Sequence, residues 1–571
     1  MARPPIGRLV ALLTVMALAL VAIVVRLGVL AVAQTGHMKD RAADQRLRTF
    51  VLPADRGEIL DANGRRLALS MPATDVYADP RYVDDPWVTA TQLAPILDQR
   101  VSALVEALAT DTTFVYLDRQ VAPDVAERIA DLALPGIGFL DVTERFYPAG
   151  PVGGQVVGFV GVDGEGLAGL ELQYQDLLAG TPGRRTVEIG RDGQPIASGV
   201  FDDRPPIPGW SIVTTIDRDL QFQVQALLEE AVQQQRAKGG TVVVLDPGTG
   251  DVLAMASYPW FDPNDLGEAA PGTIRNRAIT DAYEPGSTNK VITAAAALEE
   301  RALPLDQLLS VPWTMRVGDF TIHDAESHTL QQMMLGDVIA RSSNIGAVQV
   351  ANEVGSSDMA AYLARFGLGS ETGIGFPGES SGITVPFYNW DEVILATTAY
   401  GQGITATPLQ MASVFATIAN DGRWVRPRLV EARIDPEGVR HDAAASPERR
   451  VVSRSTSLNV ARMLAFAVEH GTGKNASVPG YQVAGKTGTA RIPLHGEPGY
   501  LEGQYMASFI GFLPARDPSV VIAAILDRPA QRYGSVAAAP LFQRVARAAI
   551  AQLRIEATEP LSPPPHALPA A

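Results

Sequence analysis

Residues 9–33 limit most strongly what the start of this chain can form, because they carry no charge apart from Arg26. As a helix this segment would rise about 37 Å, and the apolar core of a bilayer is about 30 Å thick. We predict one membrane-spanning helix over residues 9–33, after a short tail (1–8) and before a charged connector (34–55). A signal peptide cleaved after Ala33 is the alternative, but the apolar run exceeds the core of about 7–15 residues that such peptides have.

Length and composition set limits on the rest of the chain. The 571 residues are 46% hydrophobic, which is enough for two to four domains with sizeable cores. The net charge of −16 and the lack of a Lys/Arg-rich block argue against nucleic acid as a partner. Because the chain has no cysteine, disulfides, thiol chemistry and cysteine-ligated zinc are excluded.

Residues 56–210 contain short mixed elements and no apparent catalytic cluster. We predict an extended hairpin over residues 51–70, because Asn63-Gly64 is a strong turn signal. Residues 88–108 and 122–134 are predicted to be helical.

One motif in this region points to a different function. Residues 164–169 fit the pattern G-x-G-x-x-G and follow a strand-like segment over residues 155–160, as in dinucleotide-binding folds. However, Asp163 and Glu165 would place negative charge beside a pyrophosphate, and no alternation of strands and helices follows. We therefore favour a chance match over a nucleotide site.

Residues 211–555 are predicted to form a second domain of the α+β class, with an antiparallel sheet flanked by helices. The Pro-rich residues 556–571 cannot pack a core, so we expect a disordered tail. The predicted helices cover residues 219–236 and 541–553, and the predicted strands cover residues 241–246, 251–256, 481–490, 506–513 and 520–526.

The stretch Ser287-Thr-Asn-Lys290 is the strongest candidate for catalytic chemistry. Pro285-Gly286 marks a loop, and the Ala-rich residues 291–298 that follow are typical of a buried helix. Residues three apart share one helix face, so the Lys290 amine can reach the Ser287 hydroxyl. A lysine with a lowered pKa can activate a serine nucleophile, although S-x-x-K alone is usually a chance match.

Two further motifs follow at wide spacing. Ser342-Ser343-Asn344 supplies S-x-N about 55 residues later, and Lys486-Thr487-Gly488 supplies K-T-G about 145 residues after that. Gly488 lets the backbone approach a ligand, and an exposed strand edge there can pair with an extended peptide. The Lys486 charge, with the hydroxyls of Thr487 and Thr489, suits a terminal carboxylate.

With these three motifs in this order, the chain resembles the class B penicillin-binding proteins, and among them the peptidoglycan D,D-transpeptidases of cell division. The resemblance runs from Arg56 to about residue 553. Besides the three motifs, it rests on residues 56–64, Tyr147-Pro148, residues 378–382 and residues 400–410. It implies a single N-terminal transmembrane helix, an elongated non-catalytic pedestal domain over residues 56–210, and a transpeptidase domain over residues 211–555.

The resemblance also implies a role for each motif residue. It makes Ser287 the nucleophile, Lys290 the base, Ser342 a proton relay, and Asn344 a hydrogen-bond donor to the substrate and to Lys290. The backbone N–H groups of Ser287 and Thr489 would form the oxyanion hole. Lys486 completes the catalytic set, and the substrate-binding positions are Ser343, Thr487, Gly488 and Thr489.

The expected reaction joins peptidoglycan stem peptides that end in D-Ala-D-Ala, and β-lactams would acylate the same serine. The resemblance places the enzyme in the periplasm, anchored in the inner membrane, beside a SEDS-type glycan polymerase and other division proteins; no cofactor or metal is implied. Counting basic residues on the two sides of the span favours the opposite orientation, and the resemblance overrides it. The alternatives are an elongation-type paralogue, a β-lactam hydrolase, and a catalytically idle scaffold or sensor. No E-x-x-L-N motif for deacylating water is present, which favours transpeptidation.

Two weaker candidate sites are set aside. Residues 378–382 fit G-x-S-x-G, but a nucleophile elbow needs a strand before and a helix after, and Pro377 and Pro386 flank this segment. His323, Asp324, Glu326 and His328 have metal-ligand spacing, yet no further ligand is apparent. We expect a solvated charge cluster there.

Overall fold

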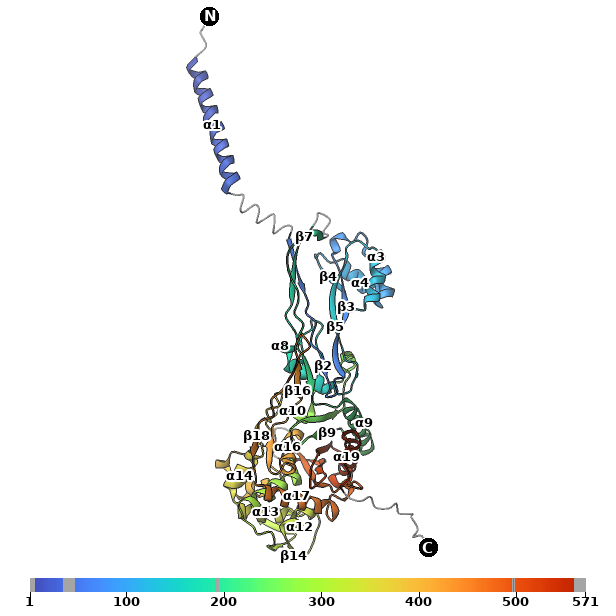
Figure 1. Ribbon diagram of the computed structural model, residues 1–571, viewed down its shortest axis with the longest axis vertical. Coiled ribbons are helices and arrows are strands. Elements are labelled where there is room, and N and C mark those ends of the chain that lie inside the picture. The colour runs from blue at the N-terminus through green and yellow to red at the C-terminus, as the bar shows by residue number, and fades with distance from the viewer. Residues whose placement is uncertain (1–5, 34–46, 190–194, 495–496, 498, 559–571) are drawn as a thin grey trace. The chain divides into compact units, whose positions relative to one another are not determined.

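The computed structural model describes residues 6–33, 47–189, 195–494, 497 and 499–558 (Figure 1). Residues 559–571 of the predicted disordered tail and residues 34–46 of the connector lie outside the described residues. The chain divides into two compact units: the first comprises Met1–Asp55 and Gly180–Pro208, and the second comprises Arg56–Ala179 and Gly209–Ala571.

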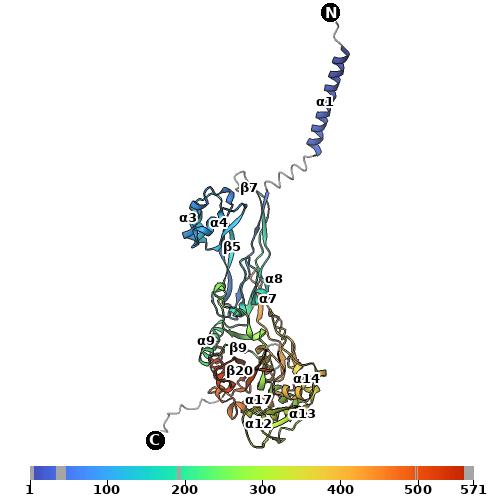
Figure 2. The ribbon, with the colours of Figure 1, turned by 180° about the vertical axis from the view of Figure 1, so that it is seen from behind.

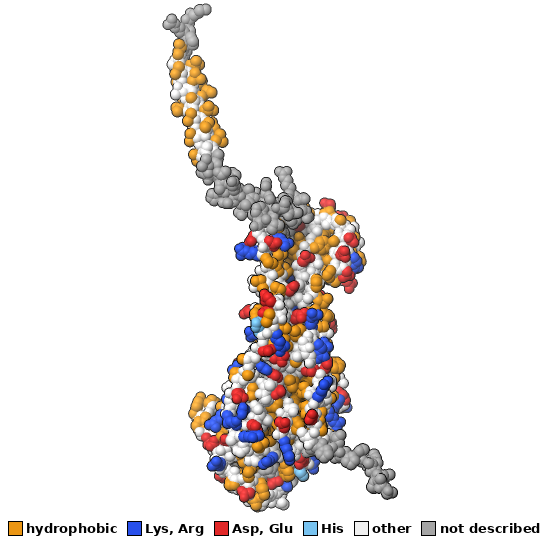
Figure 3. All heavy atoms as spheres, in the orientation of Figure 1, with side chains coloured by type: hydrophobic (Ala, Val, Ile, Leu, Met, Phe, Trp, Pro, Cys, Tyr) orange, Lys and Arg blue, Asp and Glu red, His pale blue; other side chains and the backbone are white. Residues whose placement is uncertain are grey.

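The first unit contains the predicted membrane helix. Helix α1 (Ile6–Ala33) has 28 residues, and its part Ile6–Val29 has a mean hydropathy of 2.7 and no buried side chain. Apolar side chains cover this helix in Figure 3. Among the described residues it is the one helix long and apolar enough to cross a bilayer, which confirms the predicted apolar helix and agrees with a membrane span. The unit also has an antiparallel sheet of three strands, β1 (Leu47–Leu52), β6 (Gly183–Ile189) and β7 (Pro195–Arg204), in the order β1-β6-β7.

The second unit begins with the predicted hairpin. Asn63-Gly64 forms the turn between β2 and β3, and Gly64 has φ of +77°, which confirms the turn signal. The single helix expected over residues 88–108 is wrong: the chain forms two helices, because Asp98 is left-handed (φ 51°) and ends the first. The elements are β2 (Ile59–Leu60), β3 (Arg66–Ala78), η1 (Pro80–Tyr82), α3 (Pro86–Leu97), α4 (Val101–Leu108), β4 (Val115–Val121), α5 (Pro123–Ala130) and β5 (Ile137–Phe146).

The G-x-G-x-x-G segment lies between short helices that pack closely together. Residues 155–160, expected to be a strand, form helix α6 (Gly154–Val157) and a loop, so the strand that a dinucleotide fold needs is missing there. Glu171, in α7 (Gly169–Gln173), is fully buried and binds Arg56 at 2.6 Å and Arg145 at 2.7 Å. A Cβ at Gly166 would lie 2.0 Å from Glu171 O, and one at Gly169 would lie 2.5 Å from Gly158 N, so the glycines of the motif serve internal packing.

A five-stranded antiparallel sheet forms the centre of the predicted transpeptidase domain (Figures 1 and 2), in the order β10-β9-β21-β20-β19. Both of its faces are buried. On β9 the side chains of Val242 and Val244 pack with α9 and α19, whereas Val243 packs with the core around α11, α16 and α17 on the other face. This confirms the predicted α+β fold. The strands are β9 (Gly239–Leu245), β10 (Val252–Tyr258), β19 (Ala484–Pro493), β20 (Tyr500–Leu513) and β21 (Val520–Asp527).

Helices carry most of the candidate site and cover the sheet. Helix α9 (Arg218–Gln235) and helix α19 (Ala539–Leu553) match the predicted helices within two residues. The other α-helices and strands are α8 (Gln175–Leu178), β8 (Ser211–Thr214), α10 (Arg277–Thr280), α11 (Lys290–Glu299), β11 (Leu309–Val311), β12 (Thr314–Val317), β13 (Phe320–His323), β14 (Gln331–Met333), α12 (Leu335–Arg341), α13 (Asn344–Val354), α14 (Ser356–Arg365), α15 (Glu392–Ala399), α16 (Pro408–Ala419), β15 (Arg423–Val425), β16 (Val430–Ile434), β17 (Arg440–Asp442), β18 (Glu448–Arg450), α17 (Arg454–Glu469) and α18 (Gly534–Ala537).

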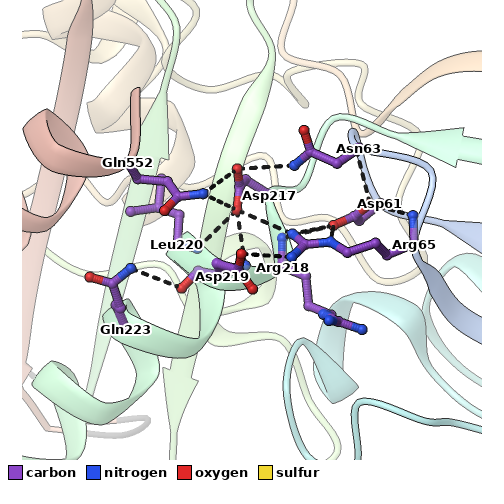
Figure 4. A network of polar contacts seen from close by, with 9 residues as sticks. All are labelled: Asp61, Asn63, Arg65, Asp217, Arg218, Asp219, Leu220, Gln223 and Gln552. Atoms are coloured by element: carbon purple, nitrogen blue, oxygen red, sulfur yellow. Dashed lines mark hydrogen bonds and ion pairs between the residues drawn. The ribbon is translucent and has the colours of Figure 1, made fainter. Parts of the chain in front are cut away.

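A polar network joins the β2–β3 turn to α9 and α19 within the second unit (Figure 4). Asp217 caps α9 and accepts hydrogen bonds from Asn63 at 3.2 Å and from Gln552 at 2.9 Å. Arg65 pairs with the buried Asp61 at 2.7 Å. Because Asn63 lies in the β2–β3 turn and Gln552 on the last helix, the network ties these two distant segments to the start of α9.

Candidate active site

Ser287 lies on a short 3-10 turn, η3 (Gly286–Asn289), directly before α11. Gly286 has φ of +54°, which favours glycine, and a Cβ there would lie 3.3 Å from the carbonyl oxygen of Thr489. The turn therefore packs against β19, and it leaves Ser287 partly exposed between buried neighbours. The sequence prediction of a serine at a helix start is confirmed.

Lys290 is fully buried, and four oxygen atoms surround its amine. Nζ lies 2.6 Å from Ser342 O, 2.8 Å from Asn344 Oδ1, 3.1 Å from Ser287 Oγ and 3.4 Å from Ser342 Oγ. The two shortest contacts are to a carbonyl and an amide oxygen, which can only accept. A neutral amine would donate its two N–H groups to these oxygens, and its lone pair could then accept a hydrogen bond from the Ser287 hydroxyl.

The surroundings of Lys290 favour this neutral form. Burial lowers the pKa of Lys290 well below its ordinary value, and the nearby charge of Lys486 lowers it further, while Asp324 acts in the opposite direction. Burial also lowers the pKa of Lys486, to about 7. The site thus holds a lysine that can serve as a base near neutral pH.

The S-x-N motif occupies the sharp connection between α12 and α13. Ser342 adopts a left-handed conformation (φ 62°), rare for a residue with a side chain, and its Oγ lies between the two lysines. Asn344 Oδ1 accepts a hydrogen bond from Lys290, and Nδ2 donates to His323 O at 3.1 Å. The expected donation from Asn344 to Lys290 is therefore wrong in direction, because the amide oxygen is the atom that faces the amine.

Ser343 does not face the site. Its hydroxyl is buried, donates to Asp324 Oδ2 at 2.7 Å and accepts from Gly346 N at 2.9 Å, so it caps α13. We therefore propose no substrate contact for Ser343, in contrast to the sequence prediction.

The K-T-G motif lies on β19, the edge strand of the central sheet. Lys486 is fully buried, and its Nζ donates to Ser342 Oγ at 2.9 Å. A Cβ at Gly488 would lie 2.2 Å from Ser508 Oγ and 3.1 Å from Pro285 O, so the glycine permits close packing of β19 on the segment before Ser287. The structure thus brings Ser287, Lys290, Ser342, Asn344 and Lys486 into one chain of hydrogen bonds.

Near these hydrogen bonds, one residue was missed in the sequence and another was assigned the wrong environment. The Thr472 and Thr487 hydroxyls lie 3.0 Å apart, and no sequence signal marked Thr472. Asp324 is buried and bonded to the start of α13, so the solvated cluster expected at residues 323–328 is wrong for this residue. In the described part of the chain, no group of three or more His, Cys, Asp or Glu residues is placed to hold a metal ion.

The comparisons with known proteins agree with this geometry. The penicillin-binding protein transpeptidase domain matches residues 240–547, and the penicillin-binding protein dimerisation domain matches residues 51–214. Penicillin-binding protein PbpB of Mycobacterium tuberculosis is 36% identical over 94% of this chain and 83% of its own length. Peptidoglycan D,D-transpeptidase FtsI of Escherichia coli is 33% identical over 89% of this chain and 86% of its own length.

Among solved structures, penicillin-binding protein 3 of Mycobacterium tuberculosis in complex with aztreonam has a TM-score of 0.71. The likeness extends over 90% of this chain and 99% of the other, with 32% identity. Both domain matches, the whole-length relatives and the fold therefore agree with the resemblance that the three motifs carry. The chain belongs to the class B penicillin-binding proteins.

Proposed function

We propose that this chain is a peptidoglycan D,D-transpeptidase that cross-links stem peptides ending in D-Ala-D-Ala through an acyl-enzyme on Ser287. The observation that carries the proposal is the position of Lys290 Nζ, 3.1 Å from Ser287 Oγ and 2.8 Å from Asn344 Oδ1. A lysine whose pKa is lowered by burial is available as a neutral base, so it accepts the serine proton as the hydroxyl attacks.

In the first half-reaction, Ser287 Oγ bonds to the carbonyl carbon of the penultimate D-Ala, and the peptide bond to the last D-Ala breaks. The leaving amine needs a proton, and Ser342 Oγ lies 3.4 Å from Lys290 Nζ and 2.9 Å from Lys486 Nζ, where it can relay one. The backbone N–H groups of Ser287 and Thr489 would stabilise the oxyanion, a contribution of about 3–4 kcal/mol for each donor.

Substrate recognition is assigned to β19. Lys486, Thr487 and Thr489 would hold the terminal carboxylate, and Gly488 keeps this strand close to the nucleophile turn. Charge-assisted hydrogen bonds of this kind are roughly twice as strong as neutral ones. In the second half-reaction an amine of a neighbouring stem peptide attacks the ester, forms the cross-link and releases Ser287. β-Lactams would acylate the same serine; the structural neighbour from Mycobacterium tuberculosis was crystallised with aztreonam.

We further propose that α1 anchors the chain in the inner membrane, that the enzyme faces the periplasm, and that it works at the division septum. The support is the apolar α1 and the similarity to relatives such as Escherichia coli FtsI. On the same resemblance, a SEDS-type glycan polymerase and other division proteins would be its partners. The pedestal domain would cover residues 56–210 and the transpeptidase domain residues 211–555.

The test follows a fluorescent penicillin on the full-length chain in detergent, beside the Ser287→Ala variant. Stable labelling of the wild type that is lost in the variant supports a transpeptidase acting through Ser287. Rapid loss of the label with turnover of the drug would support a β-lactam hydrolase. No labelling of folded protein would contradict the enzyme and favour a scaffold. A donor peptide ending in D-Ala-D-Ala, supplied with an amine acceptor, then separates cross-linking from simple hydrolysis.

A further inference from the structure

Asp324, directly after β13, is a buried carboxylate that four hydrogen-bond partners surround. Its Oδ1 accepts from the backbone N–H of Asn344 at 2.6 Å and of Ile345 at 3.1 Å. Its Oδ2 accepts from the Ser343 hydroxyl at 2.7 Å and lies 3.0 Å from His328 Nε2. Three of these partners belong to the first turn of α13 or its cap, so the carboxylate fixes the place where this helix begins.

The hydrogen-bond partners of His328 favour the charged form of its ring. Nδ1 lies 2.7 Å from Thr329 O, and Nε2 lies 3.0 Å from the Asp324 carboxylate. Both partners are acceptors, so both ring nitrogens must carry hydrogen, which only the imidazolium form allows. In agreement, the backbone bond to Thr329 and then the bond to Asp324 raise the pKa of His328. The side chains of His328 and Asp324 are 14% and 7% exposed.

Asp324 acts on two residues of the candidate site, Asn344 and Lys290. Asp324 holds the backbone N–H of Asn344, and His323 O holds Nδ2, which leaves Oδ1 directed at Lys290. In addition, the negative charge of Asp324 raises the pKa of Lys290, against burial and Lys486. Arg341 also acts on His328, because its positive charge lowers the pKa of this histidine.

We propose that the Asp324–His328 ion pair is a positioning element of the acylation step, in which His328 fixes the Asp324 carboxylate and this carboxylate aims Asn344 at Lys290 and sets the charge around that amine. The proposal rests on the function assigned above to Lys290 and Asn344. Neither member of the pair belongs to the S-x-x-K, S-x-N or K-T-G motif. Both are positioning residues, because their contacts reach the reacting atoms only through Asn344 and Lys290.

The test measures the acylation rate of the full-length chain by a fluorescent penicillin between about pH 5 and about pH 9, for the wild type, Asp324→Asn and His328→Gln. The matched control is His441→Gln, since His441 Nε2 makes a similar contact with Asp435 at 2.8 Å on the exposed β16–β17 hairpin. Because Asp324→Asn loses two of the four hydrogen bonds, we expect a rate about 10 to 100 times lower. For His328→Gln we expect a rate about 3 to 10 times lower, and for the control no change.

The pH profile distinguishes positioning from damage to the fold. The rate rises with pH as Lys290 loses its proton. Asp324→Asn removes a negative neighbour of Lys290, so the acid limb of the profile moves to lower pH. His328→Gln removes the cationic partner of the Asp324 carboxylate, so this carboxylate raises the pKa of Lys290 more strongly and the limb moves to higher pH. A general loss of stability would lower the rate without moving the limb in opposite directions.

Three results decide the matter. Lowered rates with opposite shifts of the acid limb support the proposal. This inference alone is overturned if the wild type is acylated and both variants react within about twofold of its rate. It is also overturned if the variants react more slowly but the acid limb of their pH profiles does not move. Failure of the wild type to acylate at Ser287 would instead contradict the proposed function, and this inference with it. If Asp324→Asn does not fold, the rate and limb of His328→Gln decide, since that change leaves the three helix-cap bonds in place.

Discussion

Replacing the buried Lys486 by methionine should stabilise the fold near neutral pH while it disables the site. Methionine has a similar volume and carries no charge, so it fills the space of the lysine without its desolvation penalty. Lys486 is fully buried, and burial lowers its pKa from 10.5 to about 7. This shift measures how strongly the folded state disfavours the charged lysine.

The magnitude follows from proton linkage. Between about pH 10.5 and about pH 7 the unfolded chain binds a proton at Lys486 that the folded chain rejects, so the free energy of unfolding falls as pH falls. At about 1.4 kcal/mol per pH unit, the loss amounts to about 4 kcal/mol at pH 7. Lys486→Met removes this loss but also the hydrogen bonds to Ser342 and Thr487, a cost of about 1–3 kcal/mol. We therefore expect a net stabilisation of about 2 kcal/mol at pH 7 and a destabilisation above about pH 10.

Denaturant unfolding of the full-length chain, followed by tryptophan fluorescence at several pH values, measures this difference. Lys238→Met is the matched control, because Lys238 is exposed and its replacement should change stability by less than about 0.5 kcal/mol at every pH. The reasoning is refuted if Lys486→Met is no more stable than the wild type at pH 7, or if the difference between them does not depend on pH.

Three further substitutions test other parts of the structure. Asp217→Ala removes the cap of α9 and should cost about 1–2 kcal/mol in unfolding experiments. Although burial raises the pKa of Asp217, hydrogen bonds outweigh it and lower this pKa, so the cost should shrink as pH falls. Burial raises the pKa of Glu284, so the folded chain favours the neutral carboxyl, and the free energy of unfolding falls as pH rises and Glu284 ionises. Glu284→Gln should abolish this pH-dependent loss of stability. Gly401→Ala should destabilise the chain by about 2 kcal/mol and slow penicillin labelling, because φ is +81° and the new Cβ would lie 2.2 Å from Gly286 O; normal labelling would contradict this.

The parts of the site that nearby residues in the sequence determine were predictable. Pro285-Gly286 followed by an Ala-rich run located Ser287 at the start of α11, and the apolar strand pattern located Lys486 on a strand of the sheet. Hydrophobic alternation and turn residues in the same way located most strands of the central sheet. These features depend on the nearest few residues, which a single sequence displays.

Features that depend on distant contacts were not predictable. Residues 155–160 read as a strand, because a short apolar run does not distinguish a strand from a buried helix. The helix break at Asp98 depends on a left-handed backbone conformation, which an Asp in the sequence does not predict as a Gly would. Asp324 looked solvated, because its partners lie about 20 residues further along the chain and only folding brings them to it.

Lys486 and Asp324 have opposite effects on the pKa of the buried Lys290. Lys486 lowers the pKa of Lys290, and Asp324 raises it. Removing the positive charge by Lys486→Met should therefore move the acid limb of penicillin acylation to higher pH, whereas Asp324→Asn should move it to lower pH. Residual acylation of the two variants, measured over the same pH range, should thus lie on opposite sides of the wild-type profile. A limb that moves to lower pH in Lys486→Met would show that Lys290 is not the titrating base, and the assignment of the serine proton to its amine would fail.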